Sequence, residues 1–568
     1  MMLVAAMGLN GIAHGQTLPP SVDPGRLQDI TPGPQPQPRP TGPRIAVPEQ
    51  PQQAPVPGAE QIRLTLRSVE IEGSTVYPAG TFAPLYANLI GQQITLAQVF
   101  QVANQITLRY RQDGYILSRA VVPQQRIGAD GVARIRVIEG YIANVNVEGE
   151  RNFQVLGYGR RLQQFRPLRA EQLERYLLLA NDLPGVTARG VLSPSTTTDG
   201  ASDLTIVVEE KRVDGFVGMD NRGTRFVGPE QLFTGLGLNN LMAAGERSFL
   251  RFTTNPFQYM ELRSFQFDET VPVGSEGTRL TFSASRLRSR PGLSLRAFDV
   301  NSNATTLSVQ AYHPFIRSRA ENLNVRASFW YRNLDTEFLE NQDASPSTRD
   351  RLRILRIGGT YDLADRWQGV NSFSVDIHQG LQIFDATSNS NPLQTRPGGR
   401  TDFTKMTIDV SRLQNLSFLL QGLQLQVGLT AQFSFRGPLL ASEQIGLGSN
   451  PFGRAYDYSE ITGDNGFAGQ IELQYGRAMT LEGLRRYIQE YQAYLFYDGG
   501  IVWRHTSTGT SLPNLQSTGF GIRLNGVRGV SIDLQAAKAL SRAVANPHTP
   551  VTSDGHPWRF FFSTVVRF

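Results

Sequence analysis

The stretch from residue 213 to residue 568 most constrains the fold, because apolar and polar residues alternate there in short runs. The run 423–433 is the clearest, with Leu423, Leu425 and Val427 separated by Gln424 and Gln426. A repeat of two residues is that of a strand whose two faces meet different surroundings. The pattern predicts sixteen strands, near residues 213–221, 231–241, 246–254, 258–269, 277–288, 303–313, 321–333, 351–362, 370–381, 402–413, 421–434, 467–476, 490–503, 517–525, 529–538 and 558–568.

These strands suit a membrane barrel. The chain has no apolar run long enough for a membrane-spanning helix, and its mean hydropathy is −0.26. Barrel strands keep one face toward lipid and the other toward the lumen, so their average hydropathy stays modest. An even number of strands is expected for closure with short periplasmic turns, and the long connections 334–350, 385–400, 435–466 and 541–557 fall on every second gap. We therefore expect an all-β transmembrane barrel of about 16 antiparallel strands with these connections on the extracellular side.

The carboxyl-terminal strand places aromatic and apolar residues two apart, including Phe560, Phe562, Val566 and Phe568. An alternating last strand with an aromatic terminus resembles the signal that barrel-assembly machinery recognises. We expect that machinery to be a partner during biogenesis and outer-membrane lipid to surround the barrel.

Residues 64–212 have a different pattern, in which the order β-α-α-β-β occurs twice. In the first unit we expect a strand over 64–71, a short helix over 81–89, and a second helix that begins with the capping box Thr95–Gln98. Strands over 117–122 and 132–138 follow. In the second unit the corresponding strands are 142–147, 186–192 and 203–209, with helices over 153–165 and 171–180.

The composition predicts five segments. Residues 1–15 resemble the remnant of a signal peptide, with a short apolar run before small residues. Residues 16–62 are a proline-rich linker, interpreted as a spacer, in which the helical candidate around Arg26–Ile30 is too short for a regular plug helix. The α+β units occupy 63–140 and 141–212, and the barrel occupies 213–568.

Several chemistries have no support in the sequence. There is no cysteine, the six histidines lack metal-ligand spacing, and there is no nucleotide-binding or nucleophile-elbow motif. The net charge of +6 is spread along the chain without a basic block, which argues against nucleic acid as a partner. We therefore expect no enzyme activity and no cofactor.

The tandem units resemble polypeptide-transport-associated (POTRA) domains. The chain from about residue 64 resembles two-partner secretion transporters of the TpsB type, the haemolysin activator/secretion family. The residues Asp220-Asn221-Arg222-Gly223-Thr224 are similar to the start of that family's barrel. The stretches Glu443–Gly448 and Gly463–Gly466 flank Arg454-Ala455-Tyr456, which is similar to the Arg-Gly-Tyr tip of the family's sixth extracellular loop. Ala455 stands where the family usually has glycine.

The resemblance also implies a partner for this tip. Phe496, Asp498 and Gly500 match the Phe-x-Asp-x-Gly pattern of a later strand, whose aspartate meets the loop arginine in the family. The planar fork of an arginine in a barrel interior suits a carboxylate. Such a pair fixes position more than it adds stability, since desolvation offsets attraction.

The resemblance implies an outer-membrane transporter of a Gram-negative cell, with its amino-terminal domains in the periplasm. It would capture an unfolded TpsA-type exoprotein there and pass it to the cell surface. Three alternatives remain open: an insertase of the same superfamily, a passive porin, and a barrel enzyme. Two tandem units before the barrel favour export, because insertases usually carry more and porins have no reason to carry any.

Overall fold

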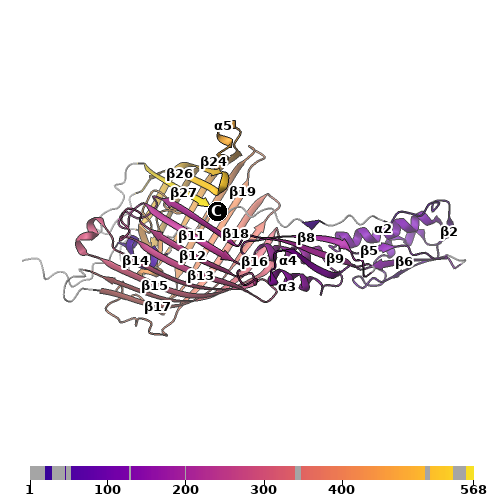
Figure 1. Ribbon diagram of the computed structural model, residues 1–568, viewed down its shortest axis with the longest axis horizontal. Coiled ribbons are helices and arrows are strands. Elements are labelled where there is room, and N and C mark those ends of the chain that lie inside the picture. Colours follow the sequence, from indigo (N-terminus) through magenta and orange to yellow (C-terminus); the bar gives the residue numbers. More distant parts are fainter. Residues whose placement is uncertain are drawn as a thin grey trace, which may run out of the picture.

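The computed structural model describes residues 19–28, 45–46, 53–126, 130–198, 200–338, 347–505, 512–541 and 558–568. Sixteen antiparallel strands form a closed barrel, and two α+β units extend from one end of it (Figure 1). The fold class and the strand number expected from the sequence are confirmed. The barrel strands are β10 (Val213–Asp220), β11 (Gln231–Asn239), β12 (Arg247–Thr254), β13 (Arg263–Val273), β14 (Thr278–Ser289), β15 (Asn301–Arg317), β16 (Glu321–Glu337), β17 (Ser347–Ala364), β18 (Gly369–Gly380), β19 (Thr404–Asn415), β20 (Leu423–Ser434), β23 (Asn465–Ala478), β24 (Ile488–Trp503), β25 (Asn514–Gly526), β26 (Val530–Ala539) and β27 (Arg559–Arg567).

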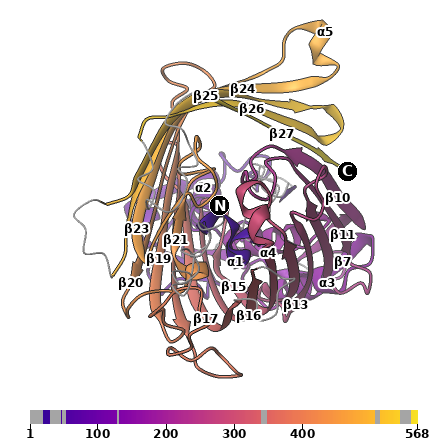
Figure 2. The same cartoon turned by 90° about the vertical axis from the view of Figure 1, so that its left-hand side faces the viewer.

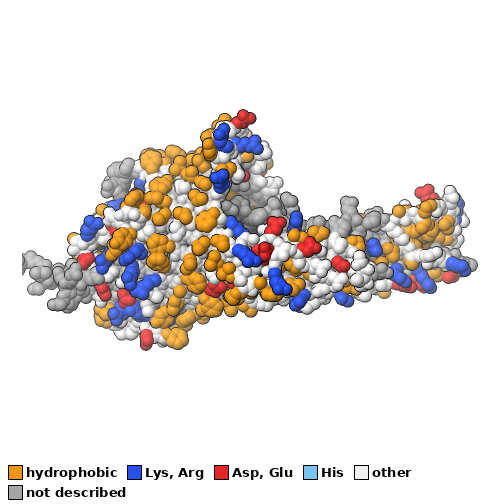
Figure 3. Space-filling view, in the orientation of Figure 1, with side chains coloured by type: hydrophobic (Ala, Val, Ile, Leu, Met, Phe, Trp, Pro, Cys, Tyr) orange, Lys and Arg blue, Asp and Glu red, His pale blue; other side chains and the backbone are white. Residues whose placement is uncertain are grey.

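The barrel closes where β10 pairs with β27, from Phe216 opposite Arg567 to Asp220 opposite Ser563. The backbones of Gly215 and Phe568 extend this seam with two hydrogen bonds of 3.0 Å. The outer face is a broad apolar band (Figure 3). Alternation along each strand explains it: on β24, Leu495 and Tyr497 are exposed, while Phe496 and Asp498 are buried toward the lumen.

The α+β units identify the two ends of the barrel. The turn between β11 and β12 contacts the second unit, where Phe153 N donates to Ala243 O at 2.8 Å. The turn between β13 and β14 does the same through Glu276, which accepts from Tyr176 Oη at 2.9 Å and from Arg161 Nε at 2.9 Å. Among the described residues, the connections 255–262, 290–300, 381–403 and 435–464 lie at the opposite end of the barrel.

The first unit contains a three-stranded sheet in the order β3–β6–β5 (Ser68–Glu72, Val132–Ile138 and Arg119–Val121) and a pair of strands, β2 (Arg63–Thr65) and β4 (Gln93–Thr95). Its long helix is α2 (Leu96–Gln112), and Gln98 Oε1 accepts from Thr95 N at 2.8 Å as the capping box requires. Buried side chains of α2, such as Phe100 and Ile106, pack against Ile135 of the sheet. This apolar cluster is the core of the unit.

Two expected elements of the first unit differ from the sequence prediction. The single strand over 64–71 is divided into β2 and β3, because the chain changes partners: Leu66 N donates to Gln92 O, and Arg67 N donates to Gly131 O. The short helix over 81–89 is wrong, since the chain forms two 3-10 turns, at Ala83–Leu85 and Ala87–Leu89. Pro84 removes a backbone donor that an α-helix there would need.

The second unit has β7 (Ile142–Gly149), α3 (Phe153–Leu162), α4 (Ala170–Asn181), β8 (Val186–Pro194) and β9 (Ser202–Glu210). Its sheet order is β1–β8–β9–β7, in which β1 (Ile45–Ala46) comes from the amino-terminal region and runs parallel to β8. The unit docks on the barrel through Asp182, which accepts from Arg317 at 2.7 and 2.8 Å. The first unit lies farther from the barrel (Figure 1).

Residues 19–28 lie inside the barrel, although the sequence suggested a spacer. They form a 3-10 turn, Pro20–Val22, and a single helical turn, α1 (Pro24–Leu27). Val22 and Leu27 are buried in a cluster with side chains of the barrel. Figure 2, which faces the loop end of the barrel, shows α1 within the ring of strands. The expected signal peptide, residues 1–15, falls outside the described residues.

Candidate functional site: loop 6 in the barrel lumen

The connection between β20 and β23, residues 435–464, is here called loop 6, and it folds back into the lumen. Its two arms pair as β21 (Ile445–Leu447) and β22 (Ile461–Gly463). The tip between them contains the predicted residues Arg454, Ala455 and Tyr456, which are 1–4% exposed. The loop therefore occupies part of the lumen, where its tip packs against the barrel wall.

Arg454 lies against the wall formed by β23 and β24. Its guanidinium donates to Glu472 and Gln470 of β23 and contacts Asp498 of β24, with 3.3 Å between Nε and Oδ2. Its Cζ lies 4.2 Å from the centroid of the Phe496 ring. All of these wall residues point into the lumen, because alternate residues of β23 and β24 share that face. The guanidinium therefore has a carboxylate on each strand and an aromatic face beside it.

Asp498 is fully buried. It binds the backbone of the loop tip as well as the charged side chain of Arg454. Its Oδ1 accepts from Gly453 N at 2.7 Å, from Arg454 N at 3.3 Å and from Ser517 Oγ of β25 at 2.5 Å. A carboxylate that accepts backbone donors fixes the path of the chain as well as neutralising the arginine. The contacts of Asp498 thus join loop 6 to two adjacent strands.

Gly500, the third predicted wall residue, makes room for the loop. A Cβ at this position would lie 2.6 Å from a methyl carbon of Leu447 on β21. On the loop, Tyr456 Oη donates to Ser541 O beyond β26 and lies 3.0 Å from Gln516 O of β25. Ala455 is not among the residues with positive φ, so its methyl group fits without strain and packs in the cluster around Tyr456.

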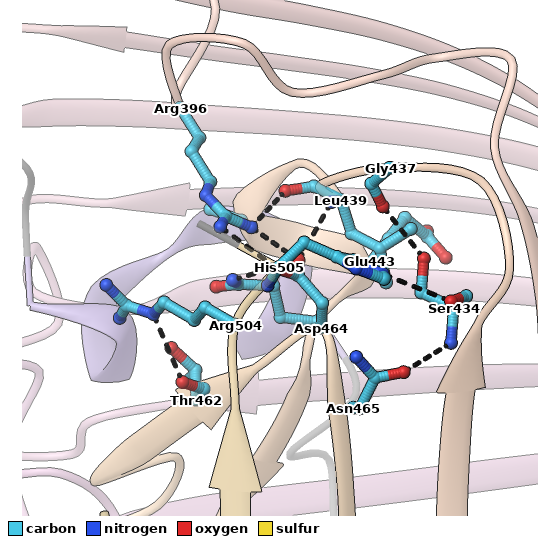
Figure 4. A network of polar contacts seen from close by, with 12 residues as sticks. Arg396, Ser434, Gly437, Leu439, Glu443, Thr462, Asp464, Asn465, Arg504 and His505 are labelled. Atoms are coloured by element: carbon cyan, nitrogen blue, oxygen red, sulfur yellow. Dashed lines mark hydrogen bonds and ion pairs between the residues drawn. The ribbon is translucent and has the colours of Figure 1, made fainter. Parts of the chain in front are cut away.

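A second polar network holds the base of loop 6 (Figure 4). Asp464, fully buried, accepts from Arg396 on the β18–β19 connection, with 3.0 Å between Nη2 and Oδ2. It also accepts from Leu439 N at 2.8 Å and from His505 N at 2.9 Å. One carboxylate thereby joins three successive connections at the loop end of the barrel.

A third network surrounds Glu443, which is 1% exposed. Its Oε2 lies 2.8 Å from Lys405 Nζ, and its Oε1 lies 3.6 Å from Arg332 and 3.8 Å from Arg356. Lys405 also donates to the backbone carbonyl of Glu443 at 2.7 Å. Cations from three barrel strands thus converge on one side chain of the loop.

The amino-terminal segment is attached to the same loop by Arg26. Its Nε and Nη2 donate to Ala441 O at 2.9 and 2.6 Å, and Nη2 donates to Gln444 O at 2.7 Å. Its Nη1 donates to Ser459 Oγ at 3.2 Å. The segment and loop 6 therefore occupy the lumen together.

Sequence reasoning paired Arg454 with Asp498 alone. It did not identify Glu472, Gln470 or Ser517 as neighbours of that pair. The signal was present in β23, where Gln470, Glu472 and Gln474 alternate with Ile471 and Leu473, which is the pattern of a lumen-facing polar row. It also assigned no role to Arg26 or to the partners of Glu443 and Asp464.

The predicted assembly-signal residues lie on the opposite face of the wall. Phe560 is 73% exposed, Phe568 is 55% exposed and Val566 is 40% exposed on the outer side of β27, and Phe562 shares their face. Phe561 points inward and is buried beneath Arg559. The last strand thus has one lipid-compatible face and one face toward loop 6.

No group of three or more metal-binding side chains occurs among the residues that the structure describes. Across the same residues, no helix has both the length and the apolar character needed to cross a membrane.

Two family profiles match the chain. The first, described as the haemolysin secretion/activation protein ShlB/FhaC/HecB, covers residues 200–524, and the second, the ShlB-type POTRA domain, covers residues 64–140. The chain belongs to the haemolysin secretion/activation family. It is an outer-membrane transporter of two-partner secretion, with a periplasmic POTRA region and a secreted TpsA-type protein as its partner.

Relatives within this family match this chain over most of its length. The heme/hemopexin transporter protein HuxB of Haemophilus influenzae is 23% identical over 504 residues, which cover 86% of this chain and 84% of HuxB. The outer membrane transporter CdiB of Dickeya dadantii is 23% identical, with 72% of each chain covered. The solved structure of CdiB from Escherichia coli has the same fold, with a TM-score of 0.71, 20% identity, and 91% and 92% of the two chains covered.

Proposed function

We propose that this transporter moves its client through the barrel lumen, and that Arg454 and Asp498 hold loop 6 in the position that export requires. The observation that carries the proposal is the way the lumen is filled. Loop 6 and residues 19–28 are attached there by ion pairs and hydrogen bonds at the tip, at the base and through Arg26. Polar contacts of this kind can exchange for hydrogen bonds to water or to the client.

We further propose that an unfolded client is first captured by strand addition in the periplasm. The second unit, residues 141–212, would act as a second POTRA domain next to the barrel, residues 213–568. Its strand β8 accepts β1 in parallel, with Ile45 opposite Gly190 and Ala46 opposite Val191. An edge that accepts one extended segment through main-chain hydrogen bonds suits clients of varied sequence.

Transport in this proposal involves no catalytic chemistry and no cofactor, and client folding outside the cell supplies the energy. A client variant that cannot fold should then be exported more slowly than its parent. Equal export rates for the two clients would contradict this source of energy. Biogenesis would use the barrel-assembly machinery through Phe560, Phe562, Val566 and Phe568, with membrane lipid against the outer face.

The first experiment measures the client in cells with and without this chain. Loss of surface client, with accumulation in the periplasm, is the result expected for export. Unchanged client with depletion of other barrel proteins would support the insertase alternative instead. Removal of residues 60–210 separates export from a passive pore, because a porin would conduct small solutes equally well without them.

A further inference from the structure

The outer face of the barrel has three arginines near its extracellular end, here called the rim arginines: Arg263, Arg286 and Arg288. Arg263 begins β13, and Arg286 and Arg288 lie near the end of β14. Arg286 and Arg288 are exposed, whereas Leu287 and Ser289 between and beyond them are fully buried toward the lumen. The rim arginines therefore point away from the lumen, into the layer that surrounds the barrel.

The register brings these three charges together. Arg263 lies directly opposite Arg288, and Arg286 lies opposite Phe265 in the next outward-facing row. Like charges directly opposite each other on two strands repel. Within the described residues, none of the three forms an ion pair, and Arg263 only contacts the ring of Tyr259, with Cζ 5.7 Å from its centroid. The cluster therefore has a surplus of positive charge that its own neighbours leave uncompensated.

An apolar groove of about 620 Å³ lies directly below this charge. Its outward-facing lining comes from six strands and includes Leu236, Leu250, Phe252, Phe265, Phe267 and Leu307, with Arg286 at its upper edge. Phe252 and Phe265 lie 4.6 Å apart between ring centroids, and Leu250, Phe265 and Phe267 are 41–59% exposed. The view in Figure 3 shows the apolar band of this face, with Lys and Arg side chains at its loop end.

A second hollow, of about 330 Å³, lies above the rim arginines between the connections 255–262 and 290–300. Tyr259, the aromatic contact of Arg263, lines this hollow together with Arg290 and Arg296. The order from the loop end toward the periplasm is thus a hollow lined by apolar residues and by charges of both signs, a cationic row and an apolar groove. The cationic row and the groove have the same order of chemistry as the phosphates and acyl chains of a lipid.

We propose that the rim arginines bind a phosphorylated, multiply acylated lipid of the outer leaflet. The phosphates would lie between Arg263, Arg286 and Arg288, and the acyl chains would lie along the groove. Arginine suits phosphate because its planar fork donates two parallel hydrogen bonds to phosphate oxygens. A charge on the lipid face of a barrel costs less near the interface than at the midplane, and a bound phosphate offsets that remaining cost.

The test measures lipid binding to the purified full chain by native mass spectrometry. The probes are bis-phosphorylated hexa-acylated lipid A, the same lipid with its phosphates removed, and inorganic phosphate. We expect the chain to prefer the phosphorylated lipid by at least about tenfold, and the triple variant R263Q/R286Q/R288Q to lose that preference. The control is Arg349→Gln, because Arg349 is a rim residue that already pairs with Asp335 at 3.2 Å, and it should keep the preference.

Three outcomes would overturn the proposal: no preference for the phosphorylated lipid in the parent chain, an unchanged preference in the triple variant, and displacement of the lipid by inorganic phosphate at comparable concentration. The last outcome would assign the cluster to a free anion. Assembly of each variant is checked by heat-modifiable migration on gels. If the triple variant does not assemble, Arg286→Gln replaces it, and a preference equal to that of the parent would again overturn the proposal.

Discussion

The interior of the first α+β unit is filled by apolar side chains, whereas the lumen of the barrel combines apolar clusters with many buried charged and polar side chains. In the unit, Phe100, Ile106 and Ile135 form a continuous core. In the lumen, Glu443 and Asp464 of loop 6 are just as buried, but each meets arginine, lysine or backbone donors. Apolar packing has no preferred direction, while the ion pairs and hydrogen bonds of the lumen are directional. Under the proposed function, the first unit stays closed while the lumen opens during export.

The largest effect should follow from Glu443→Ala, which removes the carboxylate around which Lys405, Arg332 and Arg356 gather. Breaking a buried pair from one side costs about 3–5 kcal/mol because the remaining charges are left uncompensated. We expect loop 6 to detach more often while the barrel stays assembled. Because the chain has no cysteine, a thiol introduced at the buried Ser442 reports that opening by its labelling rate.

The labelling rate in Glu443→Ala should rise more than about tenfold over the parent with the same reporter. Glu482→Ala is the matched control, since Glu482 is an exposed carboxylate on α5 (Glu482–Arg485) at the periplasmic end. Equal labelling in Glu443→Ala and Glu482→Ala would contradict the role of the Glu443 network.

In the apolar interior, Ile135→Ala should cost about 2–5 kcal/mol, through lost burial and the cavity left behind. Ile135→Val, which removes a single methylene group, should cost about 0.5–1.5 kcal/mol. Urea-dependent proteolysis of the first unit in the full chain measures both. Heat-modifiable migration of the barrel should not change, and a simultaneous loss of barrel assembly would show that the two interiors are coupled.

A smaller effect is expected from Arg26→Ala, which removes the hydrogen bonds that residues 19–28 make to the carbonyls of Ala441 and Gln444. Hydrogen bonds from a charged donor contribute about 1.5–3 kcal/mol. The segment should leave the lumen more often, which raises the fraction of time that single channels conduct in planar bilayers. Gln28→Ala is the comparison, since Gln28 attaches the same segment to β15 instead of loop 6. An open fraction in Arg26→Ala no higher than that of the parent would contradict the attachment by Arg26.

The smallest effect concerns pH in the first unit. Burial opposes ionisation of Glu139, but hydrogen bonds from Thr75, Val76 N and Tyr110 outweigh it and hold the pKa of Glu139 below its usual value of 4.5. A lowered folded-state pKa gives stability that is present above the unfolded value and is lost as the pH falls through the folded one. The unit should therefore weaken below about pH 4.5, by about 1 kcal/mol or less given its partial exposure. In Glu139→Gln this part of the pH dependence should disappear from urea unfolding curves. An unchanged pH dependence would contradict the contribution of Glu139 to stability.

The barrel could be predicted from the sequence because a period of two is a local signal. The errors of the strand prediction are local too. The strand expected to begin at residue 258 begins at Arg263, because the Asn255 side chain accepts from Phe257 N and Gln258 N and holds a turn there. The division of residues 64–71 between two partners was not predictable, since pairing with Gly131 depends on residues far along the chain.

The candidate site could be predicted only from the motifs that match the family. Arg454 and Asp498 could be named because the family resemblance supplies both. Glu472 lies opposite Phe496 in the register of β23 and β24, and such a register is set by the whole barrel and not by either strand alone. Arg26 lies 415 residues from Ala441, so nothing in its local sequence indicates that contact.

The measurement that tests the central claim most directly is client export by Arg454→Ala, compared with Arg412→Ala as control. Arg412 pairs with Asp365 at 2.6 Å at the periplasmic end and has no contact with loop 6. Both variants should assemble a heat-modifiable barrel, and Arg454→Ala alone should lose most surface client while client accumulates in the periplasm. Normal export by an assembled Arg454→Ala barrel would contradict the claim that this arginine holds loop 6 for transport.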